Sequence, residues 1–364
     1  GMLNKLKNMK KRTRSNAVTY GIVIIAYVVI EILLSGGKLS SSLKGQLVPI
    51  CAYIIMALSL NLTVGVLGEL SLGHAGFMSV GAFVGSVTCI ALETAIPIPM
   101  LRFAISIIAG ALFAGIFGIL IGIPVLRLRG DYLAIVTLAF GEIIKNIVTC
   151  LYVGVDSNGL HVSFLTNADA LGLAEGGKVI IDGPTGVAGI TKLSTFTAGF
   201  ILIMITLVII LNLVNSRSGR AIMALRDNRI AAESVGIPVT KYKLMAFTTS
   251  AALAGAAGVL FAMNYTTIVA SKFNFNTSIL VLVFVVLGGL GNMWGSIIAA
   301  TVLTILPELL RGFNDYRMLI YAIVLILVML ATNNSTLKGY ISVFGEKVKS
   351  LFRRSGREDN VNAE

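Results

Sequence analysis

Ten long apolar stretches restrict this chain to the folds that a lipid bilayer accepts. A transmembrane helix needs about 20 mostly apolar residues to cross the hydrocarbon core of a membrane. The stretches are 17–34, 46–67, 70–92, 102–123, 132–152, 195–215, 244–264, 278–298, 299–310 and 317–332. The ninth is short for a span, and it is either a half-helix or a continuation of the eighth. We therefore expect an all-α fold, a polytopic transmembrane helical bundle of about ten spans.

Charged residues are scarce throughout these stretches. They make up 13% of the chain, whereas hydrophobic residues make up 56%. A soluble domain carries about 25% charged residues, and a charge in hydrocarbon costs roughly 3 kcal/mol or more. The composition therefore excludes a pair of soluble domains and indicates a chain that lies in the lipid bilayer.

The basic residues are sorted by membrane side. With the N-terminus inside, the cytoplasmic segments hold 20 Lys and Arg residues and the opposite segments hold 8. Positive charges accumulate in cytoplasmic loops. The net charge of +12 therefore reflects membrane orientation, and we expect no nucleic-acid partner. An even number of spans with both termini in the cytoplasm follows from this distribution.

This orientation divides the chain into three parts. We expect a basic cytoplasmic tail at 1–16, a transmembrane domain at 17–332 and a second basic cytoplasmic tail at 333–364. Within the transmembrane domain, 153–194 is a long external loop and 216–243 a cytoplasmic loop. The first apolar stretch is longer than the core of a signal peptide and no A-x-A cleavage site follows it, so we interpret it as an uncleaved anchor.

The cysteines do not predict a disulfide or a metal site. Cys51, Cys89 and Cys150 all lie in apolar stretches, no CxxC occurs, and both histidines are far from them in the sequence. Their number is odd, which also argues against a disulfide framework. We expect all three to be buried as small apolar side chains.

Small residues recur on one face of two predicted spans. They are Gly110, Ala114, Gly118 and Gly122 in 102–123, and Ala251, Gly255 and Gly258 in 244–264. Such faces let helix backbones approach closely in a membrane, where burial of apolar surface does not drive helices together. The pattern predicts a tightly packed bundle.

Motifs for catalysis or nucleotide binding are missing from the sequence. The string from Gly172 to Lys178 fits GxxxxGK, but Val179 replaces the Ser or Thr that would bind Mg²⁺, and the string lies in the external loop. No HExxH, GxSxG or catalytic Cys–His arrangement occurs. We expect no catalytic, cofactor-binding or metal-binding residue, and any ATPase that powers the chain must be a separate subunit.

The stretch 61–85 is poor material for a continuous lipid-facing helix. It contains six glycines mixed with Asn61, Glu69, Ser71 and His74. Irregular backbone at membrane depth is tolerated only where protein or a water-filled path surrounds it, and broken helices often mark a transport pathway. We predict that Asn61, Gly65, Glu69, Ser71 and His74 lie along such a pathway. The alternative is a cytoplasmic turn in which Glu69 and His74 are merely exposed to water.

Two ionisable residues lie in the middle of a predicted span. Glu142 and Lys145 are three residues apart and share one helix face. A local ion pair would satisfy both groups inside the membrane, which is a simpler role than contact with a substrate.

The cytoplasmic loop 216–243 is too polar to insert into the membrane. Its sequence predicts two short helices, at Ala221–Leu225 and Ile230–Val235. Asn228 can cap the second helix, and Gly236 with Pro238 can end it. Short rigid helices outside the bundle suit docking to a cytoplasmic partner, while an ordinary basic loop is the alternative.

Several segments together resemble a known family. They are 64–85, 126–143, 183–187, 224–262 and 286–295. In this order they resemble the permease subunits of branched-chain amino acid ABC importers, and the longer LivM type more than the LivH type. One departure is the string from Asn292 to Gly295, where the family often has small residues before the glycine.

The resemblance implies a type II importer permease fold in a bacterial cytoplasmic membrane. It also implies four partner subunits besides the lipid bilayer: a second, homologous LivH-like permease, two cytoplasmic ATPase subunits that hold the ATP, and an external substrate-binding protein. The segment that such permeases place on the ATPase corresponds here to Arg226, Ala231, Ala232, Glu233 and Gly236.

The sequence leaves other functions open. The same machine carrying urea, short amides or other amino acids would look alike, because the external binding protein largely selects the cargo. An ion-coupled secondary transporter would be expected to have ionisable residues in several spans, and a membrane-embedded enzyme would need a nucleophile or metal-ligand cluster. Dependence on ATP separates the first alternative from the second, and formation of a product identifies the third.

Overall fold

A computed structural model of the chain describes residues 11–36, 41–128, 130–156, 159–164, 171–173, 177–310 and 316–333. Ten helices in this part of the chain correspond one to one to the predicted stretches. They are α2 (Lys11–Ser35), α3 (Ser41–Asn61), α4 (His74–Ala91), α5 (Pro99–Val125), α6 (Asp131–Thr149), α7 (Phe196–Asn215), α10 (Val239–Ala262), α11 (Phe275–Gly288), α12 (Met293–Leu309) and α13 (Arg317–Asn333).

Seven helical segments of the described chain are long and apolar enough to cross a membrane. They include α4, α5, α6, α7 and α10, together with α3 extended to Leu67 and α11 extended back to Ala270. α12 and the apolar part of α2 are shorter. The helical, polytopic character of the chain is confirmed, while the number of about ten spans stays a prediction.

The chain divides into two compact units, one ending at Ile305 and the other beginning at Leu306. α13 belongs to the second unit, and α12 crosses the boundary. Of the predicted tails, 1–10 and 334–364 lie outside the described residues. α2 begins at Lys11, so helix extends into the expected N-terminal tail.

Three helices form the core of the first unit. In α3, α4 and α10, 89%, 78% and 72% of the membrane-spanning window is buried, against 33% in α5, α6, α7 and the α11 segment. The outer helices instead expose large aliphatic side chains, such as Ile108, Leu120 and Ile201. In water such contiguous apolar surface would promote association of the protein with other molecules. In a membrane, lipid chains contact this surface instead. The arrangement is that of a bundle with three central helices and a lipid-facing periphery.

The two predicted faces of small residues pack against each other, between α5 and α10. A Cβ atom on Gly255 would lie 2.4 Å from the Cβ of Ala114, and one on Gly118 would lie 2.7 Å from the Cβ of Ala251. α4 enters the same seam, since a Cβ on Gly81 would lie 2.0 Å from the carbonyl oxygen of Gly255. Only helices without side chains at these positions can approach this closely, which confirms the predicted tight packing.

A five-stranded antiparallel sheet interrupts the helical fold, and the all-α prediction missed it. The strands are β1 (Tyr152–Asp156), β2 (Gly159–Ser163), β3 (Lys178–Asp182), β4 (Val187–Ala188) and β5 (Thr267–Ile268). Their spatial order is β2-β1-β3-β4-β5. Four of the strands come from the stretch expected to be an external loop, and β5 follows α10. Val187 pairs with Ile268 and Ala188 with Thr267, so the sheet joins the α6–α7 connection to the end of α10.

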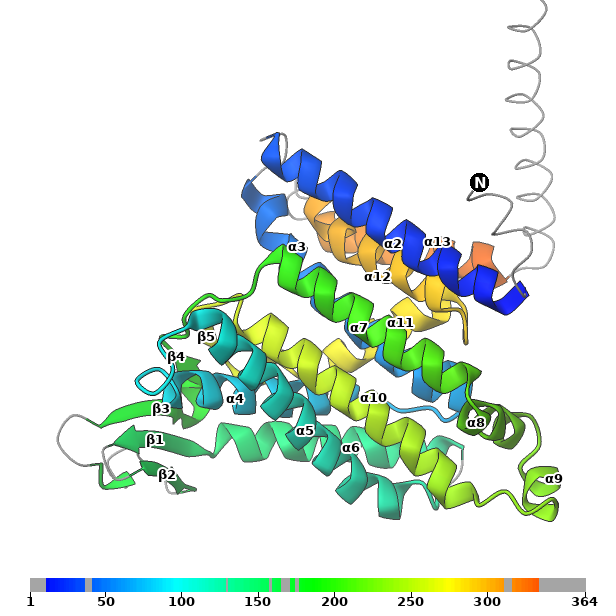
Figure 1. Cartoon of the computed structure of the whole chain (residues 1–364), viewed down its shortest axis with the longest axis horizontal. Helices are drawn as coiled ribbons and strands as arrows, with labels where there is room; N and C mark the ends of the chain where they lie inside the picture. The colour runs from blue at the N-terminus through cyan, green and yellow to red at the C-terminus, as the bar shows by residue number, and fades with distance from the viewer. Residues whose placement is uncertain are drawn as a thin grey trace, which may run out of the picture. The chain divides into compact units, whose positions relative to one another are not determined.

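α10 connects this sheet to a helical pair at its other end. Its N-terminus follows α8 (Arg217–Asp227) and α9 (Arg229–Ser234), and its C-terminus precedes β5. Figure 1 shows the strands and the two short helices at opposite ends of α10. The first unit therefore has a sheet end and an α8–α9 end.

The predicted length of the eighth span was wrong. The stretch 278–298 was expected to be continuous, but α11 ends at Gly288 and α12 begins at Met293. Gly289 and Gly291 have φ values of 93° and 78°, a left-handed backbone that a helix cannot accommodate. The apolar pattern of the stretch concealed this break.

One cysteine differs from expectation. Cys51 and Cys89 are buried as predicted, but Cys150 is exposed, so that part of the prediction is wrong. It caps the C-terminus of α6 directly before β1. α6 ends at Thr149, three residues before the end of the predicted stretch at 152.

Candidate functional site

The predicted break in 61–85 is present. α3 continues as a π-helix, η1 (Leu62–Leu67), and the chain then leaves helical geometry until α4 begins at His74. Gly68 ends η1 with a φ of 80°, in the left-handed region that favours glycine. Gly73 is held so closely that a Cβ would lie 2.0 Å from the carbonyl oxygen of Thr137 in α6. π-helical turns frequently occur at functional sites.

Asn61 joins this break to the second break, between α11 and α12. Its side chain is fully buried. Its Nδ2 donates to the carbonyl oxygen of Asn292 at 3.1 Å and lies 2.9 Å from the Ser296 hydroxyl. Its Oδ1 accepts from the backbone N–H of Gly291 at 2.8 Å. One amide thus accepts from the Gly291 N–H at the second break and adds hydrogen bonds to Asn292 and Ser296 at the start of α12.

Gly65 permits the same contact. A Cβ at this position would lie 1.9 Å from Asn61 Oδ1 and 2.2 Å from the backbone nitrogen of Gly291. Any side chain here would separate the two breaks. Gly65 is therefore required by the close approach of η1 to the α11–α12 turn, and not by an unusual backbone angle.

His74 is buried, so the alternative of a wetted turn is wrong for this side chain, whereas Glu69 keeps partial exposure. Glu69 forms an ion pair with Lys243 at the start of α10, and the two side chains are 15% and 5% exposed. His74 is 2% exposed, and its Nε2 lies 2.7 Å from the Ser59 hydroxyl of α3. These contacts tie the break to the central helices.

Ser71 completes the predicted pathway set. Its side chain is 1% exposed, and its hydroxyl has no hydrogen-bond partner within the described part of the chain. Two cavities, one between α2, α3, α7 and α12 and one beside β5, include none of the five predicted residues in their linings. Their place along a transport pathway stays a prediction, while their burial at the helix break is observed.

The predicted helices of the cytoplasmic loop are present with the expected caps. Asn228 Oδ1 accepts from the backbone N–H of Ala231 at 3.0 Å and starts α9. Gly236 follows α9 with a φ of 84°. Leu225, Ala232 and Val239 form a small buried cluster between α8, α9 and α10. The α8–α9 pair is therefore an ordered element with its own packing, which a simple basic loop would not have.

The predicted coupling residues have different surroundings. Ala231, Glu233 and Gly236 are exposed, whereas Ala232 is 4% exposed and packs inside the pair. Glu233 accepts from Arg229 Nε at 3.1 Å. Ala232 is thus positioned to hold α9 in place and not to contact a partner.

Two exposed apolar residues on α9 were not predicted. Ile230 is 80% exposed and Val235 is 76% exposed, at opposite ends of this six-residue helix. Both residues are evident in the sequence, but their exposure could not be predicted from it. It follows from the buried position of Ala232, because Ile230 and Val235 point away from that packed side. Exposed aliphatic side chains beside charged ones are typical of surfaces that bind another protein.

Arg226 brings the two predicted sets of residues together. Its Nη1 donates to the carbonyl oxygen of Gly65 in η1 at 3.0 Å, and its Nε and Nη2 donate to Asp227. A Cβ on Gly68 would lie 2.5 Å from Cγ of Arg226. A residue expected at the ATPase contact therefore reaches the backbone of a residue expected on the pathway.

The predicted ion pair of α6 is also present. Lys145 Nζ donates to the Glu142 carboxylate, and Glu142 Oε1 accepts from the backbone N–H of Phe275 at 3.2 Å. The pair therefore satisfies the first N–H group of α11 as well. This is the structural role that we expected for these two residues.

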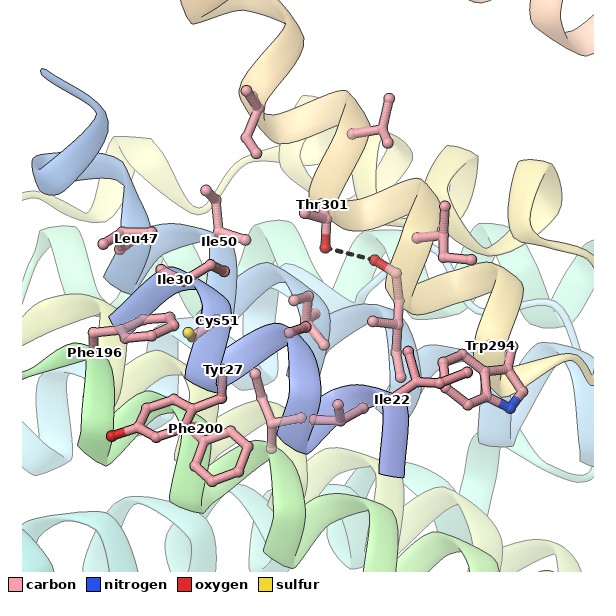
Figure 2. Close-up of a pocket in the computed structure, with 18 residues that line it drawn as sticks. Ile22, Tyr27, Ile30, Leu47, Ile50, Cys51, Phe196, Phe200, Trp294 and Thr301 are labelled. Carbon is pink, nitrogen blue, oxygen red and sulfur yellow. Dashed lines mark hydrogen bonds between the residues drawn. The ribbon is translucent and has the colours of Figure 1, made fainter. Parts of the chain in front are cut away.

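The larger of the two cavities is an apolar cleft of about 390 Å³ between α2, α3, α7 and α12. Figure 2 shows Tyr27 beside Phe196 and Phe200, with Cys51 and Trp294 also in the wall. Tyr27 stacks on Phe200 with ring centroids 4.1 Å apart. The Thr301 hydroxyl already donates to the carbonyl oxygen of Ile297 at 2.8 Å. This cleft suits hydrocarbon and offers little to orient a polar solute.

The string that resembles a nucleotide-binding loop has another structure. Lys178 and Val179 begin β3, and Lys178 Nζ lies 3.6 Å from Glu93. Residues 174–176 of the string lie outside the described residues. In the described ranges, no group of three His, Cys, Asp or Glu side chains could hold a metal ion.

Comparison with known proteins gives a family match and several relatives. The family described as "Branched-chain amino acid transport system / permease component" matches residues 42–329. The chain is 36% identical to the "High-affinity branched-chain amino acid transport system permease protein LivM" of Salmonella typhimurium over 297 residues, and 36% identical to that of Escherichia coli over 291. Each match covers 76% of this chain and 66% of the relative, so the chain spans about two thirds of these relatives' length.

A more distant relative is the "Fructose import permease protein FruG" of Bifidobacterium longum, with 24% identity over 76% of this chain and 87% of the relative. No solved structure matches the chain. The family match covers both helix breaks, the α8–α9 pair and all the helices of the core. The chain therefore belongs to the family of permease components of branched-chain amino acid transport systems.

Proposed function

We propose that this chain is a permease subunit of an ATP-driven ABC importer that moves leucine, isoleucine and valine across the bacterial cytoplasmic membrane. The observation that carries the proposal is the family match over residues 42–329. The identity of 36% with two LivM proteins supports the cargo, because both are named for branched-chain amino acid transport.

The importer requires partners that this chain does not supply. We infer a second, LivH-like permease, two cytoplasmic ATPase subunits that bind the ATP, and an external substrate-binding protein. The α8–α9 pair is the part that docks on an ATPase. Its exposed Ile230 and Val235, next to the Arg229–Glu233 ion pair, offer a small apolar contact with a charged rim.

The proposed mechanism uses the connection from α8 to the helix breaks. ATP binding closes the two ATPases and displaces the α8–α9 pair. Arg226 transmits this movement to η1 through its hydrogen bond to Gly65, and Asn61 transmits it to the α11–α12 turn. Interrupted helices change conformation more readily than continuous spans, because their backbone is already outside the regular hydrogen-bond pattern. The bundle thereby alternates between outward-open and inward-open states.

This mechanism requires one orientation of the chain in the membrane. The α8–α9 pair and both termini face the cytoplasm, and the five-stranded sheet faces the outside, where the binding protein delivers substrate. About ten spans, with α2, α12 and α13 added to the seven longer ones, are consistent with both ends on one side.

The test is uptake of radiolabelled leucine, isoleucine and valine by cells with and without this chain. We expect uptake that requires the chain, stops on ATP depletion and is competed by all three amino acids. Uptake that persists without ATP would contradict an ABC importer and support an ion-coupled transporter. Uptake of none of the three would leave the importer machinery in place with a different cargo.

The same assay tests a second cargo. The relative named for fructose import is also similar along most of its length, so similar permeases are not tied to amino acids. Competition by fructose, urea or short amides, with no competition by leucine, would assign the chain to one of those solutes. The higher identity with the LivM proteins favours branched-chain amino acids.

A further inference from the structure

A second cavity, of about 290 Å³, lies at the sheet end of the bundle. Its wall is built from α3, α10 and the segment that connects β5 to α11. The lining residues on which its chemistry depends are Gln46, Tyr53, Phe261, Tyr265, Lys272 and Phe273. Pockets for drug-sized ligands measure roughly 300–1,000 Å³, so this cavity fits a smaller molecule. Unlike the apolar cleft of Figure 2, it combines aromatic rings with a cation and an amide.

Lys272 supplies the positive charge of the cavity. It ends the short helix η4 (Ala270–Lys272), directly after β5. Its Nζ lies 4.9 Å from the centroid of the Tyr265 ring, and no carboxylate in the described ranges lies within ion-pair distance of it. A cation–π contact orients an ammonium group without neutralising it. The charge therefore remains available to an anionic group.

The backbone around Lys272 is fixed. Its carbonyl oxygen accepts from the Thr277 hydroxyl at 2.8 Å, and its N–H donates to the carbonyl oxygen of Val269 at 3.2 Å. The next residue, Phe273, is 2% exposed. A charge on a held backbone binds a ligand with less loss of entropy than one on a mobile loop.

The rest of the wall suits an aliphatic chain and an amine. Phe261 lies between Tyr53, Tyr265 and Phe273, with ring centroids 5.9, 5.1 and 6.2 Å from its own. Burial raises the pKa of Tyr265, against a smaller opposing effect of its hydrogen bond with Asn264, so its hydroxyl stays protonated at neutral pH. Aromatic faces bind both alkyl groups and ammonium groups.

We propose that this cavity binds a free amino acid with an aliphatic side chain. Its carboxylate pairs with Lys272, its ammonium group faces the ring of Tyr53 and the amide oxygen of Gln46, and its alkyl chain packs on Phe261. The assignment rests on the proposed function, and it adds the place where the permease itself holds substrate. This place lies near the sheet, on the side where a binding protein would release its cargo.

Binding of radiolabelled leucine to the purified permease–ATPase complex, without the external binding protein, tests the assignment. We expect Lys272→Gln to weaken leucine binding at least tenfold and Lys272→Arg to retain it within about threefold, because Arg keeps the charge. Lys192→Gln is the matched control: Lys192 is exposed near the sheet, outside the cavity lining, and its loss leaves binding unchanged. Leucinamide, which lacks the carboxylate, competes poorly with leucine at the wild-type complex.

Equal leucine binding by Lys272→Gln and Lys192→Gln would overturn the cavity assignment, as would equal competition by leucine and leucinamide. Tyr265→Leu removes the ring that orients Lys272, and a several-fold loss of affinity is expected even if Lys272→Gln fails to assemble. Leucine uptake by the wild type distinguishes failure of the cavity assignment from failure of the proposed function. Wild-type uptake of leucine with unchanged binding in the variants refutes the cavity alone, while no wild-type uptake refutes the proposed cargo.

Discussion

Asn61 illustrates how one side chain can join two distant helix breaks. Its amide contacts Gly291, Asn292 and Ser296, which follow it by 230 residues or more. The sequence predicted that the helix is interrupted near Asn61, because glycines and polar residues gather there. It could not predict the partner, because local composition carries no information about which distant backbone groups lack hydrogen bonds.

Replacing Asn61 with leucine should destabilise the fold. Asn61→Leu removes the three hydrogen bonds that join the end of α3 to the α11–α12 turn, and each contributes about 0.5–1.5 kcal/mol to stability. We expect a clearly lower apparent Tm of the detergent-purified protein. Ser79→Ala is the control, since the buried Ser79 hydroxyl has no partner in the described part of the chain. Equal Tm values for both variants would contradict the role of Asn61.

Arg226 should affect coupling more than folding. Arg226→Gln removes the charged hydrogen bond to Gly65, which contributes about 1.5–3 kcal/mol. We expect transport and substrate-stimulated ATPase activity to fall about tenfold or more, while the complex still assembles.

Arg220→Gln provides the comparison for this variant. Arg220 lies on the same helix, α8, and is exposed, so its replacement removes the same charge without touching η1. Near-normal transport by Arg226→Gln, or an equal loss in Arg220→Gln, would show that the contact with Gly65 does not transmit movement.

At the scale of elements, prediction succeeded where the signals are local. The ends of α9 follow from Asn228 and Gly236, which cap or stop a helix by contacts within a few residues, whereas α8 begins at Arg217, before the predicted start at Ala221. The sheet was not predicted, because its pairing depends on contacts between segments that are distant in the sequence. β4 and β5 have two residues each, and they pair across α7, α8, α9 and α10, so no alternating pattern is long enough to detect.

The seam between α5 and α10 makes a prediction about packing. Gly255→Ala places a Cβ 2.4 Å from Ala114 Cβ and 2.7 Å from the Gly110 carbonyl oxygen, which forces the helices apart. Overpacking of this kind costs about 1–3 kcal/mol. Gly115→Ala, whose Cβ would meet Ala252 at an ordinary 3.5 Å, should be neutral or slightly stabilising. Thermal unfolding of the two variants measures the difference, and an equal effect would refute close contact along the seam.

At the scale of the whole molecule, the sequence predicts the order of the elements better than the breaks between them. The helical content and the order of the ten apolar helices followed from hydropathy. The break at Gly289–Gly291 did not, because its flanking residues are as apolar as a continuous span. Charge counts predict an orientation in which the α8–α9 pair lies in the cytoplasm and the sheet lies outside.

Cysteine labelling tests that orientation. In a background with Cys51→Ala, Cys89→Ala and Cys150→Ser, a single Lys178→Cys change in β3 should react with a membrane-impermeant maleimide in intact cells. Arg220→Cys in α8 should react only after permeabilisation, because we place it in the cytoplasm. Both positions are exposed, so access to reagent is the only difference. The reverse labelling pattern would invert the proposed topology.

The seam of small residues also bears on how fast the permease can change state. α10 meets α4 and α5 through Gly81, Gly110 and Gly255, where backbone lies against backbone. Because glycine has no rotamers, these three positions add no rotamer barrier to a shift of α10 along the seam. The activation barrier would then arise at the two ends of α10, from the Lys243–Glu69 ion pair and the β4–β5 pairing. The kinetics of the transport cycle would thus be set at the two membrane surfaces rather than in the hydrocarbon core.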